Sequence, residues 1–353
     1  MLYILIAILI FGVLIMTHEL GHFLMAKIFG VKVNEFSICM GPAIWKRTIG
    51  ETTYAVRCIP IGGYCAMEGE DEDSEDPRAF TSAVPWKRAV ILVAGSFMNF
   101  VTGLITLVIM FSAVTGFSTP KIVDFYPDCP YESADGLQVG DIIYRIDGKR
   151  VYLYSDVSML MGRNTTGVFD LTLKRNGATV ELQDYPMEKI AYEDQGQTVY
   201  LYGLYFGSEE KTIGTVLKNA WYTSLDFARM IWMSLEDLIT GLVSVKDMSG
   251  PVGIVSVIAE TGEASETASA AALNIAYLGA FIAVNLAVMN MLPIPALDGG
   301  RVFFLVITWI LEKLIRKKID PKYEGYIHAA GMVLLLALIA VITLKDIWTL
   351  FVR

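Results

Sequence analysis

Four long apolar stretches constrain this chain more than any other feature of its sequence. They cover residues 2–29, 89–116, 267–297 and 325–344. Each is at least as long as the ~20 residues that an α-helix needs to cross a bilayer. Hydrophobic residues make up 54% of the chain, and the mean hydropathy is +0.50, which excludes an ordinary soluble domain. We therefore expect a polytopic α-helical membrane protein with four transmembrane helices.

The distribution of basic residues predicts how these helices cross the membrane. Eight Lys or Arg residues lie in residues 27–88, and six lie in residues 301–322. Because loops rich in Lys and Arg stay in the cytoplasm, both termini and the long segment from about 118 to 267 should lie outside. A cleaved signal peptide is the alternative for the first stretch. It is disfavoured because no basic residue precedes the apolar run and no small-residue cleavage site follows it.

One group of polar residues interrupts the first stretch, in the order His18-Glu19-Leu20-Gly21-His22. At about 100° per residue, His18 and His22 lie on one helical face, where both imidazoles can bind one zinc ion with Glu19 beside them as a base. Two imidazoles and a carboxylate are expensive inside a membrane unless they serve a water-filled site. The pattern therefore predicts a zinc site in the first transmembrane helix.

A catalytic zinc needs a third protein ligand and an open position. Asp298, at the end of the third stretch, is the better candidate, because two prolines just before it bend the chain where the carboxylate must approach the histidines. The predicted orientation also places Asp298 and the histidines at a similar depth near the cytoplasmic face. Two alternatives remain open. Asp298 would be an ordinary interfacial residue at a proline-broken helix end, or His328 would be the ligand, although His328 begins the fourth stretch and is expected at the interface.

The connection after the first stretch has a β pattern. Residues 31–64 contain two alternating runs and end in Gly62-Gly63-Tyr64, which predicts a small β-hairpin or sheet. The pattern leaves open whether this hairpin associates with the membrane or lies on the surface, because a membrane admits such backbone only where protein or water satisfies it. The acidic run from Glu68 to Asp76 is typical of a solvated loop.

The long segment after the second stretch begins as a second β-rich region. Asp147-Gly148 and Asn176-Gly177 are hairpin-turn signals between alternating apolar runs, with a short helical pattern at 155–161. Residues 118–207 are therefore predicted to form one small domain. Residues 212–241 predict an amphipathic helix on the membrane surface, and a fifth span is the alternative.

These patterns divide the chain into four parts. They are residues 1–117 with the first two transmembrane helices, 118–207, a helical connection at 208–266, and 267–353 with the last two transmembrane helices. The four cysteines form no C-x-x-C clip, and three of them fall on the predicted cytoplasmic side, so no disulfide is expected. The formal charge is -9 and no basic patch stands out, so nucleic acid is not an expected partner.

The sequence resembles the site-2 protease family of intramembrane zinc metalloproteases, in its bacterial RseP-like group, over nearly its whole length. Two motifs together carry the resemblance, His18-Glu19-x-x-His22 and Asn290-x-x-Pro293-x-Pro295-x-Leu297-Asp298-Gly299. Supporting matches are Gly62-Gly63-Tyr64, Trp86 to Gly95, Met98-Asn99-Phe100, Ser249-Gly250-Pro251, and the PDZ-like segments Ala134 to Asp141 and Ile146 to Gly148. Ser96 stands where the family pattern has proline, and there is one PDZ module rather than a tandem pair.

The resemblance implies roles for particular residues. His18, His22 and Asp298 would ligate Zn²⁺, Glu19 would be the general base, and Asn290 would hold substrate or stabilise the oxyanion. Gly62, Gly63 and Tyr64 would bind substrate as part of a membrane-associated β-hairpin. The extracytoplasmic β-rich domain would be PDZ-like.

The resemblance also implies a reaction and its partners. The enzyme would be a multi-pass protein of the bacterial inner membrane that cuts within transmembrane segments of single-span proteins, such as anti-sigma factors or signal-peptide remnants. Its further partners would be membrane lipid and a peptide C-terminus at the PDZ-like groove. Two other classes remain as alternatives, a non-catalytic scaffold that captures partners and a metal transporter. The intact ligand set disfavours the first, and the lack of a second polar layer disfavours the second.

Overall fold

The computed structural model describes residues 1–70, 74–194, 197–244, 248–317 and 322–352. Two compact units form the chain. The first unit contains residues 1–107 and 227–353, and the second contains residues 108–226. The second unit is thus inserted in the sequence of the first, and each is described here by itself.

Four helices of the described chain are long and apolar enough to cross a membrane, as the sequence predicts. They are α1 (Leu2–Phe29), α2 (Pro85–Phe111), α6 (Ala268–Asn290) and α8 (Lys322–Val352, with the apolar span Gly325–Thr349). The chain is therefore a multi-pass membrane protein. Two further helices of the first unit are α5 (Pro251–Ala264) and α7 (Asp298–Ile315).

The third apolar stretch is shorter as a helix than the sequence suggests. α6 ends at Asn290, and Asp298 begins the new helix α7 instead of closing the third span. The cause is the Pro293 and Pro295 pair, since proline removes a backbone donor and clashes with the preceding turn. The connection from residue 301 to 322 is consequently mostly helical, and its residues 318–321 lie outside the described part.

The helix predicted at residues 212–241 forms as α4 (Ile213–Thr240). It is not among the helices of the described chain that meet the criteria of length and hydropathy for a membrane span. Asp226, Glu236 and other charged residues interrupt its apolar pattern.

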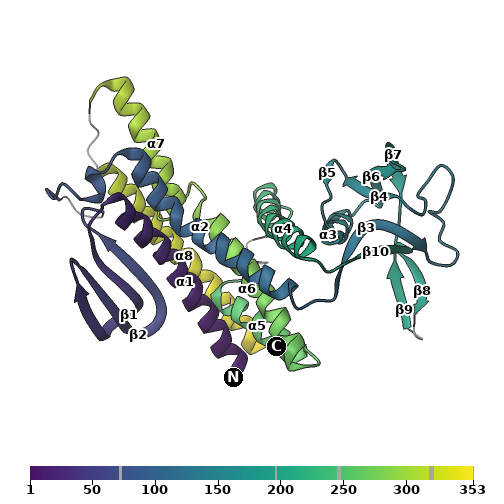
Figure 1. Cartoon of the computed structure of the whole chain (residues 1–353), viewed down its shortest axis with the longest axis horizontal. Helices are drawn as coiled ribbons and strands as arrows, with labels where there is room; N and C mark the ends of the chain where they lie inside the picture. The colour runs from purple at the N-terminus through teal and green to yellow at the C-terminus, as the bar shows by residue number, and fades with distance from the viewer. Residues whose placement is uncertain (71–73, 195–196, 245–247, 318–321, 353) are drawn as a thin grey trace. The chain divides into compact units, whose positions relative to one another are not determined.

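The first β-rich region is a sheet built from two long, bent strands. β1 (Val33–Ile49) and β2 (Thr52–Met67) pair in an antiparallel manner, and the start of β1 has partners on both sides. Ser37, for example, lies opposite both Ala55 and Tyr64. Each strand therefore supplies two segments, which form a four-segment sheet with the last segment of β2 at one edge. The predicted hairpin is confirmed, and it is a folded-back sheet whose β2 packs against α1 (Figure 1).

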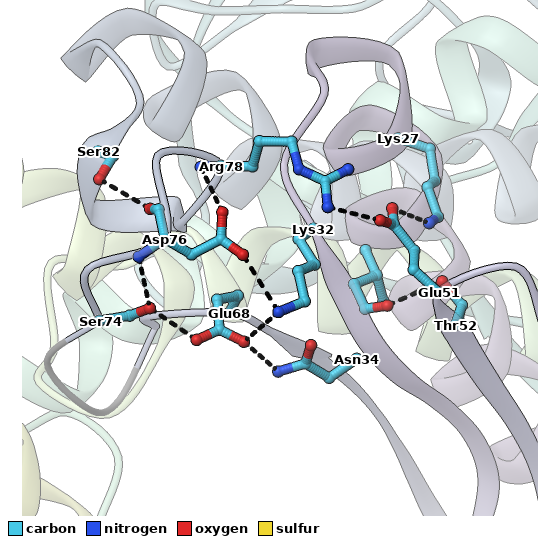
Figure 2. Close-up of polar contacts among 11 residues, drawn as sticks. Lys27, Lys32, Asn34, Glu51, Thr52, Glu68, Ser74, Asp76, Arg78 and Ser82 are labelled. Atoms are coloured by element: carbon cyan, nitrogen blue, oxygen red, sulfur yellow. Dashed lines mark hydrogen bonds and ion pairs between the residues drawn. The ribbon is translucent and has the colours of Figure 1, made fainter.

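Two carboxylate clusters fasten this sheet to its neighbours, as Figure 2 shows. Glu51, in the turn between β1 and β2, pairs with Lys27 at the end of α1 at 3.0 Å and with Arg78 at 2.8 Å. Lys32 pairs with Glu68 at 3.1 Å and with Asp76 at 3.2 Å. The ends of the acidic run are therefore engaged in ion pairs, whereas a freely solvated loop was expected; its residues 71–73 lie outside the described part.

The second unit holds one larger antiparallel sheet. Its main strands follow the spatial order β10-β3-β4-β6-β7, with the short β5 beside β4. The bounds are β3 (Gly116–Phe125), β4 (Ile142–Ile146), β5 (Lys149–Arg150), β6 (Val168–Arg175), β7 (Ala178–Pro186) and β10 (Leu204–Glu210). A separate pair, β8 (Ile190–Asp194) and β9 (Gln197–Leu201), precedes β10, and α3 spans Tyr154–Arg163.

The predicted turns of this unit lie between strands, as expected. Asp147 and Gly148 have φ of +49° and +73°, and Asn176 and Gly177 have φ of +50° and +85°. Two successive positive φ angles are typical of the tight hairpin turns that Asp-Gly and Asn-Gly favour. The core of the unit contains fully buried apolar side chains from β4 and β6, such as Ile143, Ile146 and Leu173.

Candidate metal centre

Three potential ligands from two distant parts of the chain meet in the first unit. His18 Nε2 lies 3.1 Å from Asp298 Oδ2, and His22 Nε2 lies 3.4 Å from the same oxygen. The two Nε2 atoms are 3.1 Å apart. These donor atoms all lie within 4.8 Å of one another and form, among the described residues, the one group of three or more suited to a metal ion.

The orientation of His22 is fixed by the neighbouring helix α2. Its Nδ1 lies 2.8 Å from the carbonyl oxygen of Ile91, so this nitrogen carries the proton and Nε2 keeps its lone pair for the metal. A Cβ on Gly95, one turn further along α2, would lie 2.4 Å from His22 Nε2 and 2.8 Å from His18 Cε1. Gly21 likewise lies against the backbone of Ala94. α1 and α2 therefore approach closely at the site because side chains are absent there.

The carboxylate of Asp298 is placed by the break between α6 and α7. Gly299 and Gly300 lie against the backbone of Met291 and Ile294, so close that a Cβ at either position would collide with it. The backbone N–H of Ala296 donates to His328 Nδ1 at 3.1 Å. His328 therefore braces the segment that precedes Asp298, and it is not in the ligand group of the described residues.

Glu19 faces the edge of the β1–β2 sheet. Its Oε2 accepts a hydrogen bond from the backbone N–H of Cys65 at 3.0 Å. A Cβ on Gly63 would lie 3.0 Å from the Ser37 carbonyl oxygen and 3.8 Å from Glu19 Cγ, so this glycine lies close to both β1 and Glu19. Glu19 is thus placed between the ligand pair and a β-strand.

Two other predicted site residues, Tyr64 and Asn290, lie outside the cluster of metal donors. Tyr64 donates its hydroxyl to Glu35 at 2.8 Å and accepts from Arg57 at 2.7 Å, so its side chain braces the sheet. Burial raises the pKa of Glu35, but the bonds from Arg57 and Tyr64 outweigh burial and hold that pKa below its ordinary value. Asn290 is half-buried at the last turn of α6, eight residues before Asp298.

The donor set suits a divalent metal. Asp298 Oδ2 is buried and has no hydrogen-bond partner, although two ring nitrogens face it. Lone pairs that converge in this way repel one another unless a cation lies between them. Two imidazoles and one carboxylate are a common protein ligand set of catalytic zinc, which leaves a further position open. The H-E-x-x-H motif lies in a helix of membrane length, and Asp298 is its third potential ligand. This combination defines a metalloprotease-type centre.

Comparison with known proteins agrees with this class. The model of peptidase family M50 matches residues 6–338. A protein of Clostridium acetobutylicum that is named as a candidate zinc metalloprotease is 37% identical over 347 residues, which cover 98% of this chain and 97% of the relative. Zinc metalloprotease RasP of Oceanobacillus iheyensis is 30% identical over 98% of both chains. The regulator of sigma-W protease RasP of Bacillus subtilis is 27% identical over 98% of both chains.

The chain belongs to peptidase family M50 and is a zinc metalloprotease of the membrane. Gly95, Ile91 and Cys65 also contribute to the site, although the sequence patterns indicate no such role for them. The segment that contains Gly95 carried part of the resemblance, but nothing in the sequence shows that this position faces the histidines.

Proposed function

We propose that this enzyme hydrolyses peptide bonds within the transmembrane segments of single-span proteins. The observation that carries the proposal is the position of the centre. His18, Glu19 and His22 lie inside α1, a helix of membrane length, and their third partner joins them from the start of α7. A protease of soluble substrates gains nothing from a centre in such a helix, where polar groups are costly.

In this proposal His18, His22 and Asp298 hold the zinc ion. Zinc supplies a Lewis acid that polarises the scissile carbonyl and makes water a better nucleophile. Glu19 removes a proton from the attacking water and delivers it to the leaving amine. The Cys65 N–H orients the Glu19 carboxylate for this transfer. Asn290 is assigned to the oxyanion or to substrate contact through its amide.

The edge of β2 is the proposed binding place for substrate. A helix in a membrane keeps its carbonyl groups in internal hydrogen bonds, so it must unwind before attack. The last segment of β2 pairs with β1 on one side, and its other side faces Glu19. An unwound substrate can pair with this edge as an added strand. Gly62, Gly63 and Tyr64 lie in this segment. The two glycines fit closely against Met40 and the Ser37 carbonyl, and Tyr64 holds the strand in position through Glu35 and Arg57.

The proposed orientation follows the bias of basic residues. Residues 27–88 and the connection around α7 would be cytoplasmic, and both termini and the second unit would be outside a bacterial inner membrane. Ile213, Leu217 and Trp221 of α4 are exposed apolar side chains at helical spacing, which supports contact of this helix with lipid.

The second unit is proposed to be a PDZ-like module that captures a peptide C-terminus. β10 is the end strand of the sheet, so one of its edges is unpaired in the described unit. A cavity of about 440 Å³ lies along it, lined by Leu204 to Phe206 of β10, by Val157 and Met161 of α3, and by Lys189. A peptide strand can add to the free edge beside the helix. Anti-sigma factors and signal-peptide remnants are the proposed substrates, and the name of the Bacillus subtilis relative agrees with the first class.

The test uses the purified protein in detergent. Zinc stoichiometry and cleavage of a single-span helical reporter are measured for the wild type, Glu19→Gln and Gly12→Ala. Gly12 lies in α1, and a Cβ there would have no neighbour within 4 Å, so it is the matched control. Glu19→Gln should keep zinc and lose about 10²–10⁴-fold in rate, while Gly12→Ala keeps both. Equal cleavage by Glu19→Gln would refute the role of Glu19 as the base, and zinc transport without any cleavage would favour a transporter.

A further inference from the structure

The motif Ser249-Gly250-Pro251 begins α5, and the function proposed above gives it no role. The structure shows what holds it. Asp346, in the apolar span of α8, is 6% exposed. Its Oδ2 accepts hydrogen bonds from the backbone N–H groups of Gly250 at 2.8 Å and Gly253 at 2.9 Å. A carboxylate of α8 therefore caps the first turn of α5.

Both glycines are explained by this cap. A Cβ at residue 250 would lie 2.9 Å from Asp346 Oδ2, and one at residue 253 would lie 3.0 Å from it. The carboxylate thus occupies the space that two side chains would need. A buried carboxylate in a membrane helix must be compensated, and the free N–H groups and positive end of a helix dipole can do this. Lys345 adds a second link by donating to the carbonyl of Met248 at 2.5 Å.

The capped helix packs directly against the helix that carries the histidines. Ile258 of α5 and Ala7 of α1 are both fully buried in one apolar cluster. Further along α5, a Cβ on Gly262 would lie 2.5 Å from the ring of Tyr3 in α1. α5 is therefore fixed between α8, through Asp346, and α1, through this packed face.

The other end of α8 contacts the segment that carries the third ligand. His328 Nδ1 accepts the N–H of Ala296, two residues before Asp298. Gly331 lies against Pro295, so close that a Cβ there would lie 2.4 Å from the proline Cβ. One helix thus touches the Asp298 segment directly and, through α5, the helix α1 that carries the two histidines.

We propose that Asp346 is a positioning residue for the metal centre. By clasping α5 it sets the position of α1, and with it His18 and His22, relative to Asp298, and so determines how firmly the enzyme retains zinc. This inference rests on the proposed assignment of those three residues as zinc ligands. Asp346 itself touches neither the ligands nor the substrate path proposed along β2.

The test measures the rate of zinc loss to an excess of a colorimetric chelator, with the full chain in detergent. Asp346→Ala should lose zinc about tenfold faster than the wild type, in the lower range of what residues supporting metal ligands contribute. Asp346→Asn keeps an acceptor oxygen of the same shape and should stay within about threefold of the wild type. Thr349→Ala is the matched control, because this hydroxyl donates within α8 to the carbonyl of Lys345.

A double-mutant cycle separates positioning from general damage. Gly253→Ala places a methyl group where the carboxylate lies, so it should also accelerate zinc loss. In the double variant Gly253→Ala/Asp346→Ala, the added methyl group should change the rate of zinc loss by less than about twofold. The space of the carboxylate is then vacant, and the effects of two residues in contact are not additive. If Asp346→Ala does not fold, as judged by gel filtration, Gly253→Ala decides in its place, because its methyl group displaces the carboxylate: faster zinc loss than in the wild type supports the clasp, and zinc loss at the wild-type rate overturns it.

Failure of the positioning role and failure of the ligand assignment give different results in these experiments. Zinc loss at the wild-type rate in both Asp346→Ala and Gly253→Ala, or effects that simply add, would overturn the positioning role while leaving the protease proposal intact. A wild-type protein that binds no zinc, or a His18→Ala variant that retains it fully, would instead overturn the ligand assignment on which the inference rests.

Discussion

The backbone N–H of Cys65 donates to the carboxylate of Glu19 at 3.0 Å. This single contact joins the helix that carries the proposed base to the sheet edge that is proposed to bind substrate. A strand in the middle of a sheet has no such free N–H group, because both neighbours use it. The edge position of this β2 segment is therefore what brings a backbone donor to the base.

Replacing Cys65 by proline removes this donor. We expect Cys65→Pro to lower kcat/KM for a helical reporter by about tenfold or more while zinc stays bound, since a charge-assisted hydrogen bond of about 1.5–3 kcal/mol is lost at the base. Cys65→Ala keeps the N–H and is the control for loss of the buried thiol. Equal activity of the proline and alanine variants would show that the bond has no role in catalysis.

Gly95 is expected to be essential for metal binding although it has no side chain. Gly95→Ala places a Cβ 2.4 Å from His22 Nε2, so the ring must move out of its ligand position. We expect zinc affinity to fall by about 10–100-fold, the range found when groups around metal ligands are altered. Competition with a chelator measures this, and Gly12→Ala, with no neighbour to meet, should bind like the wild type. Unchanged affinity in Gly95→Ala would contradict the packing described here.

Substitutions of Asp298 and of His328 are expected to affect the zinc content differently, although both residues were candidates for the third ligand. Asp298→Ala should reduce zinc content at least about tenfold, because a ligand itself is lost. His328→Gln keeps a polar group near the Ala296 N–H and should retain most of the zinc, as measured by metal analysis after gel filtration. Loss of zinc in His328→Gln with retention in Asp298→Ala would reverse the assignment.

The contacts of Glu68 predict that it stabilises the fold near neutral pH and that this contribution is lost in acid. The hydrogen bonds from Ser74, Asn34 and Lys32 lower its pKa from 4.5 to about 2. A carboxylate whose pKa is lower in the folded state than in the unfolded state stabilises the fold fully at pH values above its unfolded-state pKa. This stabilisation is lost as the pH falls through the folded-state pKa. The thermal midpoint of the wild type should therefore exceed that of Glu68→Gln near neutral pH, and the difference should shrink between pH 4.5 and about 2.

The difference should be small, since Glu68 is 24% exposed and water screens its ion pair. Glu75→Gln, at an exposed residue of the same loop, is the control. A constant difference between wild type and Glu68→Gln at all pH values would show that packing, and not the charge, is responsible.

The sequence predicts the main features of this structure where a strong local pattern exists. Apolar length gives the four membrane-length helices, and the turn at Asp147-Gly148 gives its hairpin. The pairing of His18 and His22 was predictable from their shared helical face, whereas the addition of Asp298 to them was favoured by its predicted depth and implied by the family resemblance, with His328 left open. These predictions depend on periodicity and on the expense of polar groups in a bilayer.

The remaining features depend on packing between distant segments. Nothing local to Gly95 or Ile91 indicates that they meet His22, since the relative rotation of α1 and α2 decides this. The end of α6 at Asn290 was missed because an apolar run extends beyond the last helical residue. The double pairing of β1 was missed too, since alternation along a strand does not reveal how many neighbours it has.

The separation of the ligands along the chain has a consequence for biosynthesis. A polypeptide made only as far as Leu297 already contains His18, Glu19 and His22, yet it lacks the carboxylate that completes their cluster. The complete donor cluster can therefore form only after translation has passed the second unit and α6.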